Sequence, residues 1–328
     1  MVNDSHLDNK PSMRKRILGR TGLEVSAFAL GTVELGLEYG INAPGHSGRP
    51  AKDEAIHLIH QALDAGINLI DTARAYGTSE EILGMALRDR RDKVILATKV
   101  TTNAPGGVPL TGDDLHRQMV ASLDESLTAL QTEYVDIWQI HNVDRNVIQQ
   151  ADVVAEVFDE VRAAGKVRFT GGSFYGAEFP VEALSLNLFD VMQITYSILD
   201  QRLTDNFFPL ATAANIGILA RSVLLKGALT ERAEHLPGHL NELRLRSRAL
   251  RDLIAANQLN ATPAQTAIAF ALAQPAIHAV LIGVSSEEEL RSNLRSLSLD
   301  LSPAMLEQLA SLRLDDPNLL NPGTWGIP

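Results

Sequence analysis

The sequence contains no cysteine, so disulfide bridges and thiolate chemistry are both excluded. It also lacks any run of the ~18–20 apolar residues that a membrane span requires. The N-terminal segment MVNDSHLDNKPSMRKR has no apolar stretch and is therefore no signal peptide. We expect a cytoplasmic protein that does not associate with membranes.

Basic residues are in the minority, with 29 Lys and Arg against 40 Asp and Glu, for a formal net charge of −11. No cluster of basic residues marks a nucleic-acid interface, so we expect a small-molecule substrate and no nucleic acid. A nicotinamide dinucleotide is also an anion. A site for it would need local positive potential from helix N-termini and a few cations.

Eight short apolar runs alternate with longer amphipathic stretches. A predicted hairpin, ILGRTGLEV with Thr21 and Gly22 at its turn, comes before the first run. The runs predict strands at 27–31, 67–71, 94–99, 135–141, 167–173, 190–195, 217–222 and 279–283. The amphipathic stretches predict helices at 53–64, 79–88, 113–130, 147–164, 180–186, 203–214, between 240 and 273, at 286–295 and at 303–312.

Repeated strand–helix units indicate a parallel sheet with right-handed crossovers. Eight units in about 300 residues favour a closed (β/α)₈ barrel of the TIM type over an open sheet. No GxGxxG turn follows the first strand, where an open dinucleotide-binding sheet would carry it. We predict one α/β barrel domain over 15–328, with an N-terminal hairpin, an extra C-terminal helix and a disordered tail at 1–14.

Polar residues mark the C-terminal ends of the predicted strands, which is where barrel enzymes build their sites. Any one of them could simply mark where a strand becomes a loop, but the full set is harder to explain in that way. They are Asp71, Lys99, His141, Ser173, Gln193, Arg221 with Ser222, and Gly283 leading into Ser285.

Asp71, Tyr76, Lys99 and His141 form the strongest catalytic candidate, because three neighbouring strand ends bring them together. Hydride reduction of a carbonyl needs a proton donor, and a tyrosine with a pKa of about 10 is a reluctant acid at neutral pH. The cation of Lys99 lowers that pKa, and Asp71 holds the lysine charged. His141 can orient the substrate oxygen by a hydrogen bond.

This arrangement resembles the aldo-keto reductase superfamily, as do LGRTGLEVSAFALGT, INLIDTARAYG, EYVDIWQIH and LIGVSSEEEL, in the family's order from about residue 16 to 313. The resemblance implies a TIM barrel, NADPH or less often NADH as cofactor, and a tyrosine acid assisted by lysine, aspartate and histidine. It implies no metal.

The resemblance also assigns cofactor contacts. Ser173 and Gln193 would hold the carboxamide, with Phe174 where asparagine is common, and Arg221 takes the usually aromatic position that stacks on the nicotinamide. A guanidinium can stack on a ring, although a cationic oxidised nicotinamide would repel it. The pyrophosphate would be lined by Ser222, Leu224 and Lys226.

The block IGVSSEEELRSN matches the adenosine-phosphate loop and includes Ser286 and Asn293. Relatives that use NADPH usually place Arg or Lys there, whereas this chain has Gly283, Ser285 and Glu289. Glu289 would repel a 2′-phosphate but could accept a hydrogen bond from a free ribose hydroxyl. Family habit favours NADP, the local charges favour NAD, and both stay open.

The long loop ELGLEYGINAPGHSGRP after the first strand is rich in Gly and Pro, and such loops commonly shape binding sites. Its Tyr39 and His46 could face a substrate, and Trp325 in the tail could cover the pocket mouth. Trp138, in mid-strand, is expected in the core. The expected substrate is a small or medium aldehyde, ketone or sugar.

Two other functions stay open. The chain could be a non-catalytic, cofactor-binding regulatory subunit like the family's ion-channel auxiliary subunits. It could also be an NAD-linked sugar dehydrogenase, because its segment LIGVSS resembles the corresponding loop of NAD-linked aldose and galactose dehydrogenases. A metal hydrolase on the same barrel would need several convergent ligands. The histidines are scattered, and only His141 ends a strand.

Overall fold

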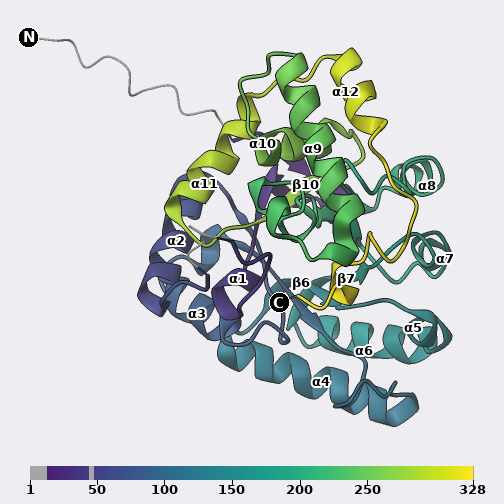
Figure 1. Cartoon of the computed structure of the whole chain (residues 1–328). Coiled ribbons are helices and arrows are strands. Elements are labelled where there is room, and N and C mark those ends of the chain that lie inside the picture. Colours follow the sequence, from purple (N-terminus) through teal and green to yellow (C-terminus); the bar gives the residue numbers. More distant parts are fainter. Residues whose placement is uncertain (1–12, 44–47, 328) are drawn as a thin grey trace, which may run out of the picture.

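The structure is a computed structural model that describes residues 13–43 and 48–327. Eight parallel strands close into a barrel in the order β10-β3-β4-β5-β6-β7-β8-β9, and helices form an outer layer around them (Figure 1). The strands are β3 (Phe28–Gly31), β4 (Leu69–Asp71), β5 (Ile95–Val100), β6 (Val135–Ile140), β7 (Val167–Phe174), β8 (Val191–Thr195), β9 (Gly217–Arg221) and β10 (Ala279–Gly283). The predicted (β/α)₈ barrel is confirmed.

A hairpin of β1 (Lys15–Ile17) and β2 (Glu24–Ser26) precedes the barrel. The short 3-10 helix η1 (Gly19–Thr21) connects the two strands. Gly22 ends this helix in the left-handed conformation, with φ at 69°. Gly19, at φ 48°, lies so close to β9 that a Cβ there would be 2.4 Å from the Gly217 nitrogen. Leu18 is fully buried and packs against inward-facing residues of the barrel, so the hairpin closes the N-terminal end.

The outer helices are α1 (Val33–Gly36), α2 (Lys52–Asp64), α3 (Ser79–Ala86), α4 (Gly112–Ala129), α5 (Arg145–Gln149), α6 (Ala151–Ala163), α7 (Pro180–Ser185), α8 (Phe208–Ala213), α9 (Asn241–Ala256), α10 (Pro263–Ala273), α11 (Glu287–Leu294) and α12 (Pro303–Ala310). Two short 3-10 helices, η3 (Leu225–Gly227) and η4 (Glu231–His235), follow β9. No helix within the described ranges combines the length and the apolar character needed to cross a membrane.

Two predicted helices differ from the structure. The stretch 147–164 divides into α5 and α6 at Gln150, whose φ and ψ of −101° and 24° are not helical. The helix predicted at 203–214 begins only at Phe208, because Pro209 lies in its first turn and a proline ring does not fit further inside a helix.

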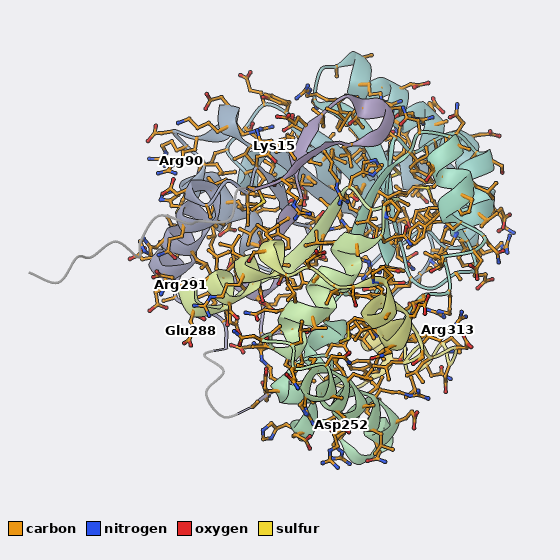
Figure 2. The ribbon with its side chains drawn as sticks, turned by 90° about the horizontal axis from the view of Figure 1, so that it is seen from above. Lys15, Arg90, Asp252, Glu288, Arg291 and Arg313 are labelled. Carbon is orange, nitrogen blue, oxygen red and sulfur yellow. The ribbon has the colours of Figure 1, made fainter. Side chains whose placement is uncertain are left out.

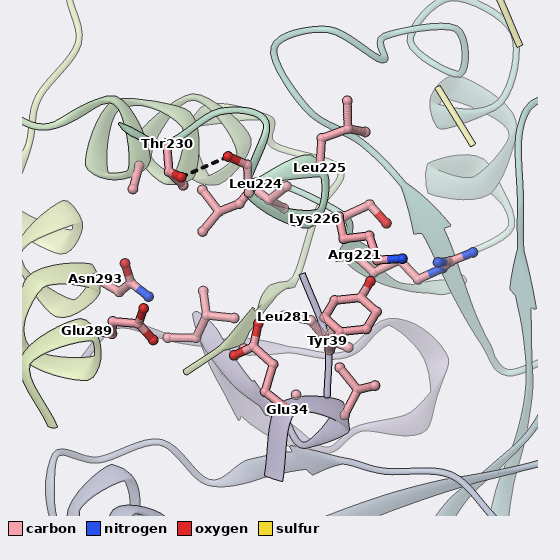
Figure 3. Close-up of a pocket in the computed structure, with 18 of the residues that line it drawn as sticks. Glu34, Tyr39, Arg221, Leu224, Leu225, Lys226, Thr230, Leu281, Glu289 and Asn293 are labelled. Atoms are coloured by element: carbon pink, nitrogen blue, oxygen red, sulfur yellow. Dashed lines mark hydrogen bonds between the residues drawn. The ribbon is translucent and has the colours of Figure 1, made fainter. Parts of the chain in front are cut away.

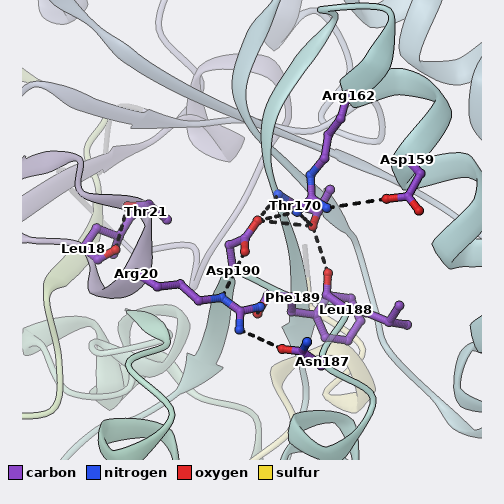
Figure 4. Close-up of polar contacts among 10 residues, drawn as sticks. All are labelled: Leu18, Arg20, Thr21, Asp159, Arg162, Thr170, Asn187, Leu188, Phe189 and Asp190. Carbon is purple, nitrogen blue, oxygen red and sulfur yellow. Dashed lines mark hydrogen bonds and ion pairs between the residues drawn. The ribbon is translucent and has the colours of Figure 1, made fainter.

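Ionic contacts fasten the hairpin to the N-terminal end of the barrel around Asp190, the residue before β8 (Figure 4). Arg20 Nε donates to Asp190 Oδ1 at 3.0 Å, and the Thr170 nitrogen donates to Asp190 Oδ2 at 3.1 Å. Arg162 also pairs with Asp190. Other charged side chains project from the periphery, among them Lys15, Arg90, Asp252, Glu288, Arg291 and Arg313 (Figure 2).

Candidate active site

An ion pair lies buried at the C-terminal end of the barrel. Asp71 ends β4 and Lys99 lies near the end of β5, and each residue is only 1% exposed. Lys99 Nζ donates to Asp71 Oδ1 and also to the carbonyl oxygen of Thr72, the latter at 3.0 Å. The parallel register pairs Asp71 with Ala97, so Lys99 lies two residues further along the neighbouring strand, on the same face of the sheet.

Tyr76 lies above this pair on the loop that follows β4. Lys99 Nζ is 5.0 Å from the centroid of the Tyr76 ring. His141, the residue after β6, meets the same ring edge-on, with centroids 5.4 Å apart and an interplanar angle of 82°. Gly77 lets the loop turn, since its φ is 58° and a Cβ would lie 2.6 Å from the Gly36 carbonyl oxygen. The four predicted catalytic side chains therefore converge.

Burial and the charges of neighbouring residues shift the pKa values of these groups. Burial raises the pKa of Tyr76 above its ordinary value, and the opposing effect of Lys99 is smaller. The expected net decrease in that pKa is therefore wrong, although Lys99 acts in the predicted sense. Burial alone would lower the pKa of Lys99, but Asp71 reverses the effect and the pKa is raised. Burial, with Lys99 and Arg221 nearby, lowers the pKa of His141 to about 3.

Two glutamines hold the second oxygen of Asp71. Gln193 Nε2 donates to Asp71 Oδ2 at 2.8 Å, and Gln139 Nε2 donates to the same atom at 3.0 Å. Gln193 was predicted to hold a carboxamide, and here its amide bonds to Asp71. Gln139 is not among the predicted site residues. Its signal in the sequence is a polar residue inside the apolar strand VDIWQIH, two positions before His141.

A cavity of about 400 Å³ extends from Asp71 and Tyr76 to the N-terminal half of α11. Glu289 and Asn293 project from α11 on one side, and Lys226 and Arg221 lie on the other (Figure 3). Of the residues predicted to contact a cofactor, the wall includes Gln193, Arg221, Ser222, Leu224, Lys226, Gly283, Glu289 and Asn293.

Three predicted contacts do not line this cavity. Ser173 is 1% exposed and lies beside Gln193 in the register of β7 and β8. Ser286 caps α11, since its hydroxyl accepts a hydrogen bond from the Glu289 nitrogen. Ser285 binds Glu289 Oε2 through its nitrogen at 2.8 Å and its hydroxyl at 3.0 Å. Both serines of the predicted phosphate loop are thus engaged within α11.

Arg221 stacks on Tyr175, with Cζ 3.7 Å from the ring centroid, and Nη2 donates to the Phe174 carbonyl oxygen at 3.1 Å. Its Nε atom is buried and has no hydrogen-bond partner among the described residues. The arginine lowers the pKa of Tyr175. Arg221 is predicted to stack on a nicotinamide, and it lines the cavity. Its contact with Tyr175 is not predicted.

The C-terminal tail meets the cavity through Lys226. Lys226 Nζ donates to the Ile327 carbonyl oxygen at 2.8 Å and lies 5.0 Å from the centroid of the Tyr39 ring. Tyr39 lines the cavity as predicted, whereas His46 lies outside the described residues. Trp325 does not line the cavity but is buried, with 2% exposure. The prediction that Trp325 covers the pocket mouth is therefore wrong.

Two further wall residues, Glu34 of α1 and Arg232 of η4, were not predicted. Burial and the nearby Glu289 raise the pKa of Glu34 to about 7, with Arg232 acting in the opposite direction. Arg232 Nη2 donates to Glu289 Oε1. No cluster of three or more candidate metal ligands occurs in the part of the chain that the structure describes.

Residues 28–313 match the sequence model of the aldo/keto reductase family. The oxidoreductase YqkF of Bacillus subtilis is 30% identical over 87% of this chain and 91% of its own length. An NADH-specific methylglyoxal reductase of Escherichia coli is 29% identical over 89% of this chain and 96% of its own.

An L-galactose dehydrogenase of Arabidopsis thaliana is 29% identical over 93% of this chain and 91% of its own. Among solved structures, the holo form of the aldo-keto reductase AKR11C1 from Bacillus halodurans superimposes with a TM-score of 0.75 at 26% identity. The superposition covers 92% of this chain and 96% of that one.

Proposed function

The chain belongs to the aldo/keto reductase family, and from this premise we propose that it transfers hydride between a nicotinamide cofactor and a small or medium aldehyde, ketone or sugar. Tyr76 is the general acid and base of this reaction. One observation carries the proposal: Tyr76 stands over the buried Lys99–Asp71 pair, with its ring against His141, at the inner end of the cavity.

The cavity suits an elongated dinucleotide. It is continuous from Tyr76 to Asn293, and the buried Arg221 Nε in its wall lacks a hydrogen-bond partner among the described residues. Arg221 and Gln193 would face the nicotinamide, Ser222 the pyrophosphate, and Glu289 and Asn293 the adenosine. When bound, the cofactor supplies or accepts the hydride.

Residues of the chain itself hold and transfer the proton that the substrate oxygen gains or loses. Because burial raises the pKa of Tyr76, its hydroxyl keeps a proton to give to the substrate oxygen in the reductive direction. The Lys99 cation stabilises the phenolate that is left, and Asp71 keeps Lys99 charged. His141 stays neutral, because its pKa is about 3. One ring N–H can therefore donate a hydrogen bond that orients the substrate oxygen, while the ring itself carries no charge.

Replacing Tyr76 with Phe tests the proposal. The variant should lose about 10²–10⁴-fold in turnover, the usual share of general acid catalysis, while fluorescence titration finds cofactor binding nearly unchanged. Turnover near the wild-type rate would show that Tyr76 is not the acid. If the wild-type protein binds cofactor but never oxidises it with 4-nitrobenzaldehyde, the chain is a binding module instead.

A second candidate is an NAD-linked sugar dehydrogenase that works in the oxidative direction. It is supported by the carboxylate of Glu289 in the cavity wall and by the likeness to a plant L-galactose dehydrogenase. A carboxylate can accept a hydrogen bond from the free 2′-hydroxyl of NAD. Oxidation of free aldoses with NAD⁺, compared with reduction of aldehydes with NADPH, separates the two activities.

A further inference from the structure

Three charged side chains from three separate elements meet at the adenosine end of the cavity: Glu34 of α1, Arg232 of η4 and Glu289 of α11. Arg232 pairs with Glu289 through Nη2 and Oε1. Glu34 packs on β10, where a Cβ at Gly283 would be 2.9 Å from the Glu34 carboxyl carbon. In Figure 3 the carboxyl groups of Glu34 and Glu289 both point into the pocket.

Both oxygens of Glu289 are engaged. Oε1 accepts from Arg232, and Oε2 accepts from the nitrogen and the hydroxyl of Ser285 at 2.8 and 3.0 Å. These contacts hold the carboxylate at the cavity wall, where a free ribose hydroxyl can donate to it. They also occupy the guanidinium of Arg232, which is the side chain best suited to bind a phosphate at this end.

We propose that the Arg232–Glu289 pair determines which nicotinamide cofactor the protein accepts, and that it selects NADH over NADPH. This inference rests on the proposed function, because it assumes that a nicotinamide dinucleotide fills the cavity. Its new element is Arg232, which lies outside the loop that the family resemblance assigns to the adenosine phosphate.

The physical argument concerns the 2′ position of the adenosine ribose. A 2′-phosphate brings about two negative charges next to Glu289, and it competes with Glu289 for Arg232. A 2′-hydroxyl brings no charge, donates to Glu289 and leaves the ion pair intact. The pair therefore disfavours the phosphate twice, by repulsion from the Glu289 carboxylate and by competition for the Arg232 guanidinium.

Fluorescence titration with NADH and NADPH tests the inference without any turnover. Wild type should bind NADH more tightly. Glu289→Gln keeps an oxygen for Ser285 but removes the negative charge that pairs with Arg232 and repels a phosphate, so the NADPH-to-NADH affinity ratio should rise about ten- to hundredfold, the size of a hydrogen bond to a charged group. Glu288→Gln removes an equal charge from the exposed side of the same turn and should change the ratio less than about twofold.

The double variant Arg232→Met, Glu289→Gln identifies the cation. It should lose the gain in NADPH affinity that Glu289→Gln alone produces. A wild-type preference for NADPH, an unchanged ratio in Glu289→Gln, or a gain that survives in the double variant would each overturn the inference. If the wild type binds neither dinucleotide, the proposed function itself fails, so the two failures are distinguishable.

Discussion

The two ends of the barrel each contain a largely buried aspartate, and the two aspartates are used differently. At the N-terminal end, Asp190 binds Arg20 and Arg162. All three donor nitrogens of Arg20 find protein acceptors, because Nη1 donates to Asn187 at 2.8 Å and Nη2 to the Phe189 carbonyl oxygen at 3.0 Å. Arg20 and Asp190 are thus paired within the protein.

At the C-terminal end of the barrel, the buried polar side chains are paired less completely. Asp71 has a single cation, Lys99, whose ammonium group faces the ring of Tyr76. Among the described residues, the buried Nδ1 of His141 and Nε of Arg221 have no hydrogen-bond partner. His141 lies against Tyr76 and Arg221 lines the cavity, so both atoms are at the end of the barrel where barrel enzymes build their sites. The comparison predicts that changes around Asp190 affect stability alone, whereas changes around Asp71 affect activity as well as stability.

The largest effect is expected from Lys99→Met. This change removes the cation beside Tyr76 and leaves Asp71 buried without its partner, which costs about 3–5 kcal/mol of folding stability for a buried pair. Turnover should fall at least about 10²-fold, and the melting temperature should fall with it. Lys93→Met, at an exposed position just before the same strand, is the control and should change neither. Near-normal turnover in Lys99→Met would refute the division between the two ends.

A smaller effect is expected at the other end. Asp190→Asn weakens the contacts of two arginines and should lower the free energy of unfolding by about 1–3 kcal/mol, as measured in urea, while turnover stays within about twofold. Asp159→Asn is the matched control. Asp159 is an exposed partner of the same Arg162 at 3.9 Å and should contribute almost nothing (Figure 4). A loss of turnover in Asp190→Asn without a loss of stability would contradict the comparison.

The features that could be predicted from the sequence are those that depend on residues close together in the chain. Strands, helices and the residues that end strands leave local, periodic signals, so the barrel and the four converging side chains could be predicted. The roles of Gln139 and Arg232 could not, because each depends on a partner 68 or 57 positions away; for Gln139 the sequence shows only that a polar residue interrupts an apolar strand. The net pKa direction of Tyr76 was missed for a related reason, since burial is a property of the folded chain.

Gln139→Leu sharpens the comparison with a modest effect. It removes one donor to Asp71 Oδ2, while the Gln193 donor at 2.8 Å stays. Losing one hydrogen bond to a charged group should reduce turnover about five- to tenfold, at the lower end of its usual worth because the other donor remains. The substrate KM should be unchanged, because Gln139 does not line the cavity. A rise in KM with normal turnover would mean that the glutamine acts on substrate binding instead of on Asp71.

The smallest effect concerns His141, for which the expected result is no change. Burial lowers its pKa from 6.5 to about 3, so the ring is neutral in the folded protein at every pH above that value. Between pH 5 and 9, neither turnover nor the ring's NMR shifts should show a histidine titration from this residue. An inflection in turnover near pH 6.5 that disappears in His141→Gln would show that the ring does take up a proton in this range, and would contradict its assignment as a neutral hydrogen-bond donor.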